Sequence, residues 1–173
     1  LQFVHVGKCG GSTICELLPR SPIVSTKYSH FFESHINGVV VNSYCDYLIC
    51  LRNPIHRAFS AFEWRRKLVL LDEDPAQLDR FPGERQILLH YGSLGEMARS
   101  LYRFDGTLDQ SVARDFNCIH HLRESISFYL MPLLGILNLR NTLGVICQET
   151  FEFDCQNILG VDASGEAKRC NNM

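Results

Sequence analysis

Four segments along the chain carry the residue pattern of β-strands. They cover residues 1–6, 23–28, 47–51 and 142–147. The run at 47–51 is apolar throughout, as is most of the last run, which is typical of strands covered on both faces. Stretches with helical patterns separate these runs. The alternation predicts an α/β fold with a mostly parallel sheet, whose ligands bind at the carboxyl ends of the strands.

The clearest helical pattern follows the third strand. Asn53 is suited to cap a helix, and Pro54 fits the first helical position. Ile55, Phe59 and Phe62 then recur at helical spacing, so we expect them to face the sheet.

The rest of the chain is largely helical in pattern. The acidic stretch at 72–84 contains prolines and a glycine and is expected to be a loop. Helices are predicted within 85–122, 125–137 and 150–159, and Gly160 ends the last of them. We therefore expect one domain over residues 1–173, with a helical insertion at about 72–137.

Composition narrows the class of protein. Of 173 residues, 46% are apolar and 21% charged, as in ordinary globular domains. The net charge of −2 gives no electrostatic basis for a nucleic-acid partner. No stretch approaches the ~20 apolar residues of a membrane span. The eight cysteines form no C-x-x-C pair and fit buried thiols in a reducing compartment, so we expect a soluble cytoplasmic protein.

The loop after the first predicted strand has the features of an anion-binding site. It reads Gly7-Lys8-Cys9-Gly10-Gly11-Ser12-Thr13. Glycines let backbone N–H groups approach an anion, a helix begins with a positive dipole, and Lys8 adds a full charge. However, the order and spacing differ from the ATPase pattern G-x-x-x-x-G-K-[ST] and from the dinucleotide pattern G-x-G-x-x-G. The loop predicts phosphate binding of another kind.

A second basic segment follows the third strand. Arg52 directly follows the run at 47–51, where a parallel sheet presents ligand-binding side chains. Ser60 comes two helical turns later, and His56 lies on its face at i, i+4 spacing. A guanidinium fork and a hydroxyl can hold one phosphate. We therefore expect Arg52 and Ser60 to form a second phosphate site.

In this order, the two segments resemble those of sulfotransferases that use 3′-phosphoadenosine 5′-phosphosulfate (PAPS). Residues 4–13 are similar to the 5′-phosphosulfate loop, in the form H-x-x-K-T-G-G-T-[ST] found in carbohydrate sulfotransferases of the heparan-sulfate 2-O and 6-O type. Residues 51–60 are similar to the 3′-phosphate motif R-[DN]-P-x-x-R-x-x-S. The resemblance implies a P-loop-like three-layer α/β fold with helices flanking the sheet.

The resemblance also implies an activity and a cofactor. A sulfuryl group would move from PAPS to an acceptor hydroxyl, for example on a carbohydrate, leaving 3′-phosphoadenosine 5′-phosphate (PAP). Lys8 would stabilise charge on the leaving phosphate oxygen, and Arg52 and Ser60 would hold the 3′-phosphate. The rest of the loop would cradle the phosphosulfate, namely Gly7, Cys9, Gly10, Gly11, Ser12 and Thr13. Cys9 departs from the family pattern, because Thr or Ser is usual there.

Sulfuryl transfer needs a base for the proton of the acceptor hydroxyl, and histidine suits this role near neutral pH. In the resembling families a base, often His, lies between the two phosphate motifs. His35 and His30 are the candidates here, and His35 is slightly favoured. Glu33 could assist or substitute.

Two other functions remain open from the sequence. A P-loop-like kinase would need Mg²⁺ and an acidic ligand after a strand, for which Glu149 is the fair candidate. A non-catalytic nucleotide-binding module would account for Cys9 and for the uncertain base. Sulfuryl transfer requires no metal, and we expect none, since Cys118, His120 and His121 form a local cluster without a second pair of ligands.

Overall fold

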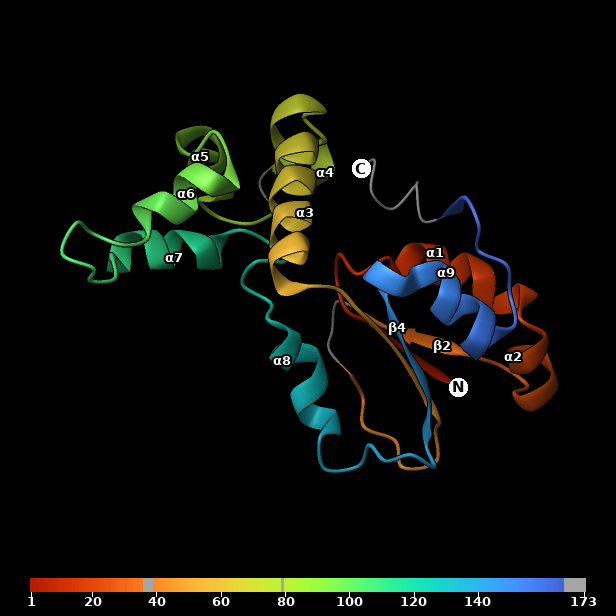
Figure 1. The fold of residues 1–173 in the computed structure, drawn as a ribbon. Coiled ribbons are helices and arrows are strands. Elements are labelled where there is room, and N and C mark those ends of the chain that lie inside the picture. Colours follow the sequence, from red (N-terminus) through yellow and green to blue (C-terminus); the bar gives the residue numbers. More distant parts are fainter. Residues whose placement is uncertain (36–38, 79, 167–173) are drawn as a thin grey trace. The chain divides into compact units, whose positions relative to one another are not determined.

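The structure is a computed structural model that describes residues 1–35, 39–78 and 80–166 (Figure 1). The chain divides into two compact units. The first comprises Leu1–Asn53 and Ile126–Met173, and the second comprises Pro54–Ser125. Each unit is described by itself.

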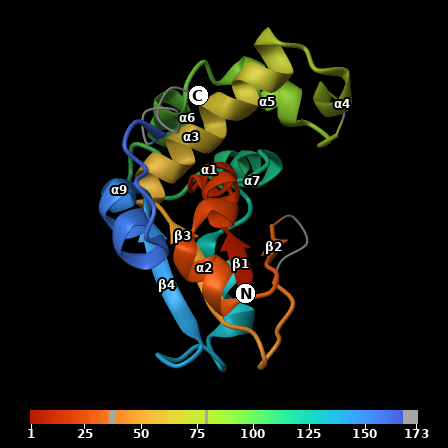
Figure 2. The ribbon, with the colours of Figure 1, turned by 90° about the vertical axis from the view of Figure 1, so that its right-hand side faces the viewer.

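The first unit is built on a four-stranded sheet. The strands are β1 (Gln2–His5), β2 (Phe32–Ser34), β3 (Tyr47–Leu51) and β4 (Thr142–Cys147). All neighbours pair in parallel, and their order is β2-β1-β3-β4 (Figure 2). The parallel sheet and its helices confirm the predicted α/β class.

Helices cover both faces of this sheet, giving three layers. On one face lie α1 (Gly11–Leu17), α2 (Pro22–Lys27) and α9 (Phe151–Asp154), and on the other lies α8 (Ile126–Leu130) (Figure 1). Short helical turns extend them, at Leu18–Arg20 after α1, Met131–Leu133 after α8, and Gln148–Thr150 and Cys155–Leu159 around α9. The core between the layers is apolar, and its fully buried members include Phe3, Ile14, Leu48, Tyr129 and Leu159. Gly160, in the left-handed region at φ 67°, ends the last helical segment as predicted.

Two sequence predictions about strands are wrong. Residues 23–27 lie in helix α2 and Tyr28 is its C-cap, so this segment is not a strand. Ser21 caps the helix by accepting a hydrogen bond from the Val24 N–H, and Pro22 occupies its first turn. The predicted strand β4 exists, but it is not a central strand: it lies at an edge of the sheet and is mostly only half-buried. Val145 in that strand is accordingly 37% exposed.

The second unit is helical. It contains α3 (Pro54–Arg66), a π-helical turn (Lys67–Leu71), α4 (Pro75–Leu78), α5 (Glu84–His90), α6 (Leu94–Ser100) and α7 (Gln110–Cys118). The helix α3 begins at Pro54, as predicted. Of the three apolar residues expected on one buried face, Phe62 lies in the core of this unit with Val69 and Met97, whereas Ile55 and Phe59 are exposed.

A buried ion pair lies within this second core. Arg65 is fully buried, and its guanidinium donates to both carboxylate oxygens of Glu84, at 2.9 and 2.6 Å. It also donates to the side-chain oxygen of Gln77 at 2.8 Å. Across the described residues, no helix is both long enough and apolar enough to cross a bilayer.

Candidate functional site

The loop after β1 has the backbone shape of an anion-binding nest. Lys8 and Gly10 both lie in the left-handed region, at φ 66° and 80°. Left-handed residues alternating along a turn direct successive N–H groups into one concavity. The Cys9 N–H instead donates to the Val6 carbonyl at 3.2 Å, and the Cys9 side chain is 1% exposed. Through this bond and its buried side chain, Cys9 therefore anchors the loop to the core of the first unit.

The two adjacent glycines are required by close neighbours within the protein. A Cβ on Gly10 would lie 2.0 Å from Oε1 of Gln148, and one on Gly11 would lie 1.9 Å from the His5 ring. Neither distance is tolerable, so any side chain would push Gln148 or His5 away. The sequence suggested that these glycines admit a phosphate. The structure adds that they also leave room for the side chains of Gln148 and His5.

Polar atoms without partners gather beside the loop. Arg52, just after β3, places Nη1 3.5 Å from the Lys8 carbonyl oxygen, while its Nε is buried and has no hydrogen-bond partner. Gln148, just after β4, is 9% exposed, and both its amide oxygen and its amide nitrogen lack partners. Leaving such groups unpaired costs about 1–3 kcal/mol each. Unpaired groups of this kind are what a polar ligand would satisfy.

The sheet topology places this group of residues where α/β proteins bind ligands. The chain leaves β1 for β2 on one side and leaves β3 for β4 on the other, so β1 and β3 flank a topological switch point. Ligands of open α/β sheets bind outside the carboxyl ends of the strands at such a point. The Lys8 loop follows β1 and Arg52 follows β3, so both lie at this switch point.

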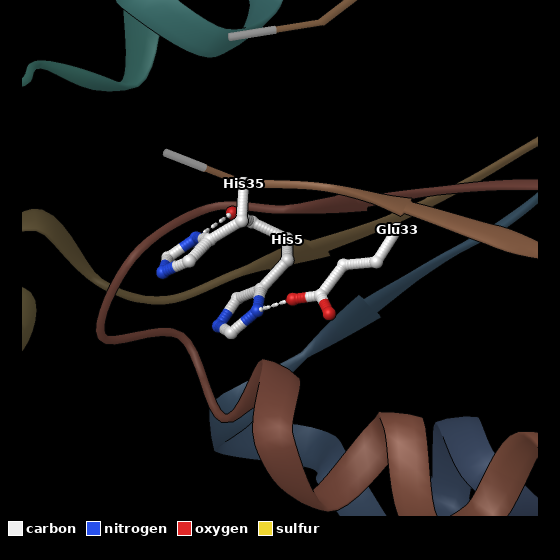
Figure 3. A group of neighbouring side chains, drawn as sticks. All are labelled: His5, Glu33 and His35. Atoms are coloured by element: carbon white, nitrogen blue, oxygen red, sulfur yellow. Dashed lines mark hydrogen bonds and ion pairs between the residues drawn. The ribbon is translucent and has the colours of Figure 1, made fainter. Parts of the chain in front are cut away.

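Two histidines and a glutamate meet at the same edge of the sheet (Figure 3). Because β1 and β2 pair in parallel, with Val4 opposite Ser34, His5 and His35 come side by side, and their rings stack with centroids 3.9 Å apart. The His5 Nδ1 bonds to the Glu33 carboxylate, and the His35 Nδ1–H donates to the His5 carbonyl oxygen at 2.9 Å. A carbonyl oxygen can only accept, so His35 in its neutral form carries its lone pair on Nε2.

The environment keeps His5 neutral and Glu33 charged. Burial lowers the pKa of His5 below 6.5, and the nearby His35 lowers it further, against the opposing effect of Glu33. Burial alone would raise the pKa of Glu33, but the hydrogen bond from His5, the charges of His5 and His35 and a hydrogen bond from Cys15 together lower that pKa below 4.5. A neutral imidazole N–H therefore donates a hydrogen bond to an ionised carboxylate.

Acidification is expected to destabilise the protein through His5. As pH falls below 6.5, the unfolded chain takes up a proton that the folded His5 resists, so unfolding becomes more favourable. Glu33 acts in the same direction at lower pH. In chemical unfolding experiments the free energy of unfolding should fall between about pH 6.5 and about pH 5, and His5→Gln should remove part of that fall. The control His30→Gln, at an exposed histidine, should keep the wild-type profile; identical profiles for all three proteins would contradict the assignment.

The candidate bases lie at opposite ends of β2. His35 follows the strand and lies beside His5, whereas His30 precedes it, and the His30 carbonyl accepts from the N-terminal amine at 3.2 Å. His30 lines a separate hollow of about 410 Å³ with Lys27, Tyr28 and other residues at the amino edge of the sheet. Only His35 therefore shares an edge with the Lys8 loop.

Other predicted residues take different places. Ser12 is exposed and Thr13 half-buried at the start of α1. Ser60 and His56 lie on α3 in the second unit, so the two halves of the expected 3′-phosphate site belong to different units. The Glu149 carboxylate accepts the Asn53 N–H at 2.9 Å, a bond that ties β3 to the segment after β4.

The thiols near this edge are held in their protonated form. Burial, and then the charge of Glu33, raise the pKa of Cys15 to about 12. Burial also raises the pKa of Cys50 well above its ordinary value, and Cys50 is fully buried. None of the seven described cysteines forms a disulfide, and Cys170 lies outside the described residues. These raised pKa values fit a role for the two thiols in packing and not as reactive thiolates.

Sequence reasoning missed His5 and Gln148 as members of this site. His5 stood in the phosphosulfate motif, and that was a usable signal. Gln148 carried none, because its position depends on how β4 pairs with β3. In comparisons with known proteins, no protein-family model, no curated protein and no solved structure matched the chain.

Proposed function

We propose that the protein is a sulfotransferase that moves a sulfuryl group from PAPS to an acceptor hydroxyl. The observation that carries the proposal is the group of polar atoms at the switch point. The Lys8 loop, the guanidinium of Arg52 and the unpaired amide of Gln148 lie together at this switch point. Together with the sequence resemblance, this basic group favours a nucleotide with more than one phosphate.

In the proposed reaction the acceptor oxygen attacks sulfur in line with the departing phosphate oxygen. The new O–S bond forms as the S–O bond to the phosphate breaks, and PAP leaves with the electron pair. Lys8 stabilises the charge that develops on that oxygen. Ser12 and Thr13 donate hydroxyl hydrogen bonds to the phosphosulfate, and Arg52 holds the 3′-phosphate.

His35 is the proposed base. Its Nδ1–H is held by the His5 carbonyl, so its Nε2 is set to take the proton of the acceptor hydroxyl. His5 positions the His35 ring by stacking on it, and Glu33 fixes the tautomer of His5. His30 stays a weaker candidate, because it lies at the other edge of the sheet.

The proposal is tested by calorimetry with PAP and with ADP. PAP should bind about tenfold or more tightly than ADP, because a charged hydrogen-bonding contact to the 3′-phosphate contributes about 1.5–3 kcal/mol. Arg52→Gln should remove this preference, while the matched exposed-site variant Arg20→Gln should retain it. Equal binding of the two nucleotides by the wild-type protein would refute the 3′-phosphate assignment. Binding of PAP without sulfate transfer to any of a panel of glycans would favour the non-catalytic module.

A further inference from the structure

The second unit contains a cluster of metal-ligating side chains that sulfuryl transfer does not use. His120, His121 and Glu124 follow α7, and their donor atoms lie within 4.8 Å of one another. The two histidines are each 4% exposed and Glu124 is 9% exposed. Cys118, which the sequence grouped with these histidines, is not part of the cluster.

The distances inside the cluster are those of donors around a common ion. Nε2 of His120 lies 3.5 Å from one oxygen of Glu124, and Nδ1 of His121 lies 3.5 Å from the other. This separation exceeds the 2.7–3.2 Å of a good N–H···O hydrogen bond. In a tetrahedral zinc site with bonds of about 2.1 Å, neighbouring donor atoms lie about 3.4 Å apart.

The local backbone brings these three side chains together. His121 is in the left-handed region at φ 67°, which turns its ring to the same side as that of the preceding residue. The two rings consequently stack with centroids 3.9 Å apart and planes at 26°. Because an ion binds in the plane of an imidazole, metal binding would turn one ring about its Cβ–Cγ bond.

Aromatic side chains shield this cluster from water, and one of its imidazole nitrogens has no hydrogen-bond partner. Phe81 stacks on the His120 ring with centroids 4.3 Å apart, and the Trp64 ring lies 5.3 Å from that of His121. Nδ1 of His120 is buried without a hydrogen-bond partner. A buried, unsatisfied imidazole beside a buried carboxylate is costly, and a divalent cation would offset that cost.

We propose that His120, His121 and Glu124 bind a divalent first-row transition metal, with Zn²⁺ the best fit. Two imidazoles and one carboxylate form a donor set that Zn²⁺ accepts readily, with a fourth position left for water. Arg57 donates to the Glu124 carbonyl at 2.7 Å and so anchors the backbone of this ligand. All three ligands come from one short segment, so the ion would stabilise the turn after α7 within the second unit.

The experiment uses Co²⁺ as a spectroscopic probe in the full chain. Co²⁺ shows visible d–d bands at low-coordinate nitrogen and oxygen sites and quenches nearby indoles. The chain has a single tryptophan, Trp64, which contacts His121. After treatment with EDTA, the wild-type protein should bind about one Co²⁺ per chain at this site, with d–d bands and strong quenching of Trp64 emission. Added Zn²⁺ should reverse both signals, since Zn²⁺ lies above Co²⁺ in affinity.

Two ligand variants and two controls complete the test. Glu124→Gln preserves shape and His121→Asn preserves polarity, and each should weaken Co²⁺ binding by about tenfold or more, since even outer-shell losses cost about 10–100-fold. His90→Asn, at an exposed histidine of the same unit, should behave as wild type. His35→Asn reports on the other His–Glu cluster, formed by His5, Glu33 and His35, and should leave the Trp64 signal intact. The proposal would be overturned if the wild-type protein showed neither d–d bands nor quenching. It would also be overturned if the signals were lost in His35→Asn and kept in Glu124→Gln. The first outcome does not depend on whether every variant folds.

Discussion

Replacing Lys8 with Ala is expected to abolish most sulfuryl transfer, lowering the rate by about 10²–10³-fold, the cost of losing one donor to a developing oxyanion. Affinity for PAP should fall by about 10–100-fold, because a charged hydrogen bond contributes about 1.5–3 kcal/mol. Calorimetry with PAP measures the second effect without knowledge of the acceptor. Transfer from radiolabelled PAPS to a mixture of glycans measures the first.

Lys27→Ala is the matched control. It removes a lysine from the same unit, at the opposite edge of the sheet, where its ammonium pairs with Asp46 at 2.8 Å on the surface. An exposed pair contributes about 0–1 kcal/mol to stability and should contribute nothing to PAP affinity. Comparable losses in both lysine variants would remove the proposed role of Lys8.

The largest expected effect on stability comes from Arg65. Arg65→Met should lower the free energy of unfolding of the second unit by about 3–5 kcal/mol, because it leaves the Glu84 carboxylate buried without its cation. Glu84 is 1% exposed and also accepts the His120 backbone N–H at 2.9 Å. Urea unfolding followed by the fluorescence of Trp64 reports on this unit directly.

A second substitution separates lost charge from lost packing. Arg65→Met combined with Glu84→Gln removes the stranded charge but keeps an acceptor for His120, so the double variant should recover much of the lost stability. Arg85→Met, at an exposed pair with Glu73, should cost less than about 1 kcal/mol. A loss from Arg65→Met as small as that from Arg85→Met would show that the buried pair contributes little.

The sequence was sufficient for the class of fold and for two of the site's segments. Largely apolar segments identified β1, β3 and β4, and Asn53-Pro54 identified the start of α3, because these signals are local. Residues 23–28 were misassigned because β-branched residues outweighed the Ser-Pro capping signal before them. The burial of β4 was misjudged because strand order, which makes β4 an edge, is a property of the whole sheet.

The site was predictable only where its residues are contiguous. The Lys8 loop and Arg52 could be read from motifs. The stacking of His5 on His35 depends on the register of β1 against β2, and the contact between Gln148 and Gly10 depends on the end of β4. The sequence showed the two adjacent histidines of the proposed metal-binding cluster, but no sequence pattern indicated that Glu124 is buried beside them. In each case tertiary contacts supplied what spacing could not.

The pairing of the short strand β2 has a consequence for the temperature range over which His5 and His35 stay in contact. Three residues of an outermost strand bring the second imidazole next to the first. A short edge strand unfolds locally far more often than a central strand of a sheet. Each local opening separates the two rings while the rest of the molecule stays folded. Warming would therefore abolish the proposed sulfuryl transfer at temperatures well below that at which the whole protein unfolds.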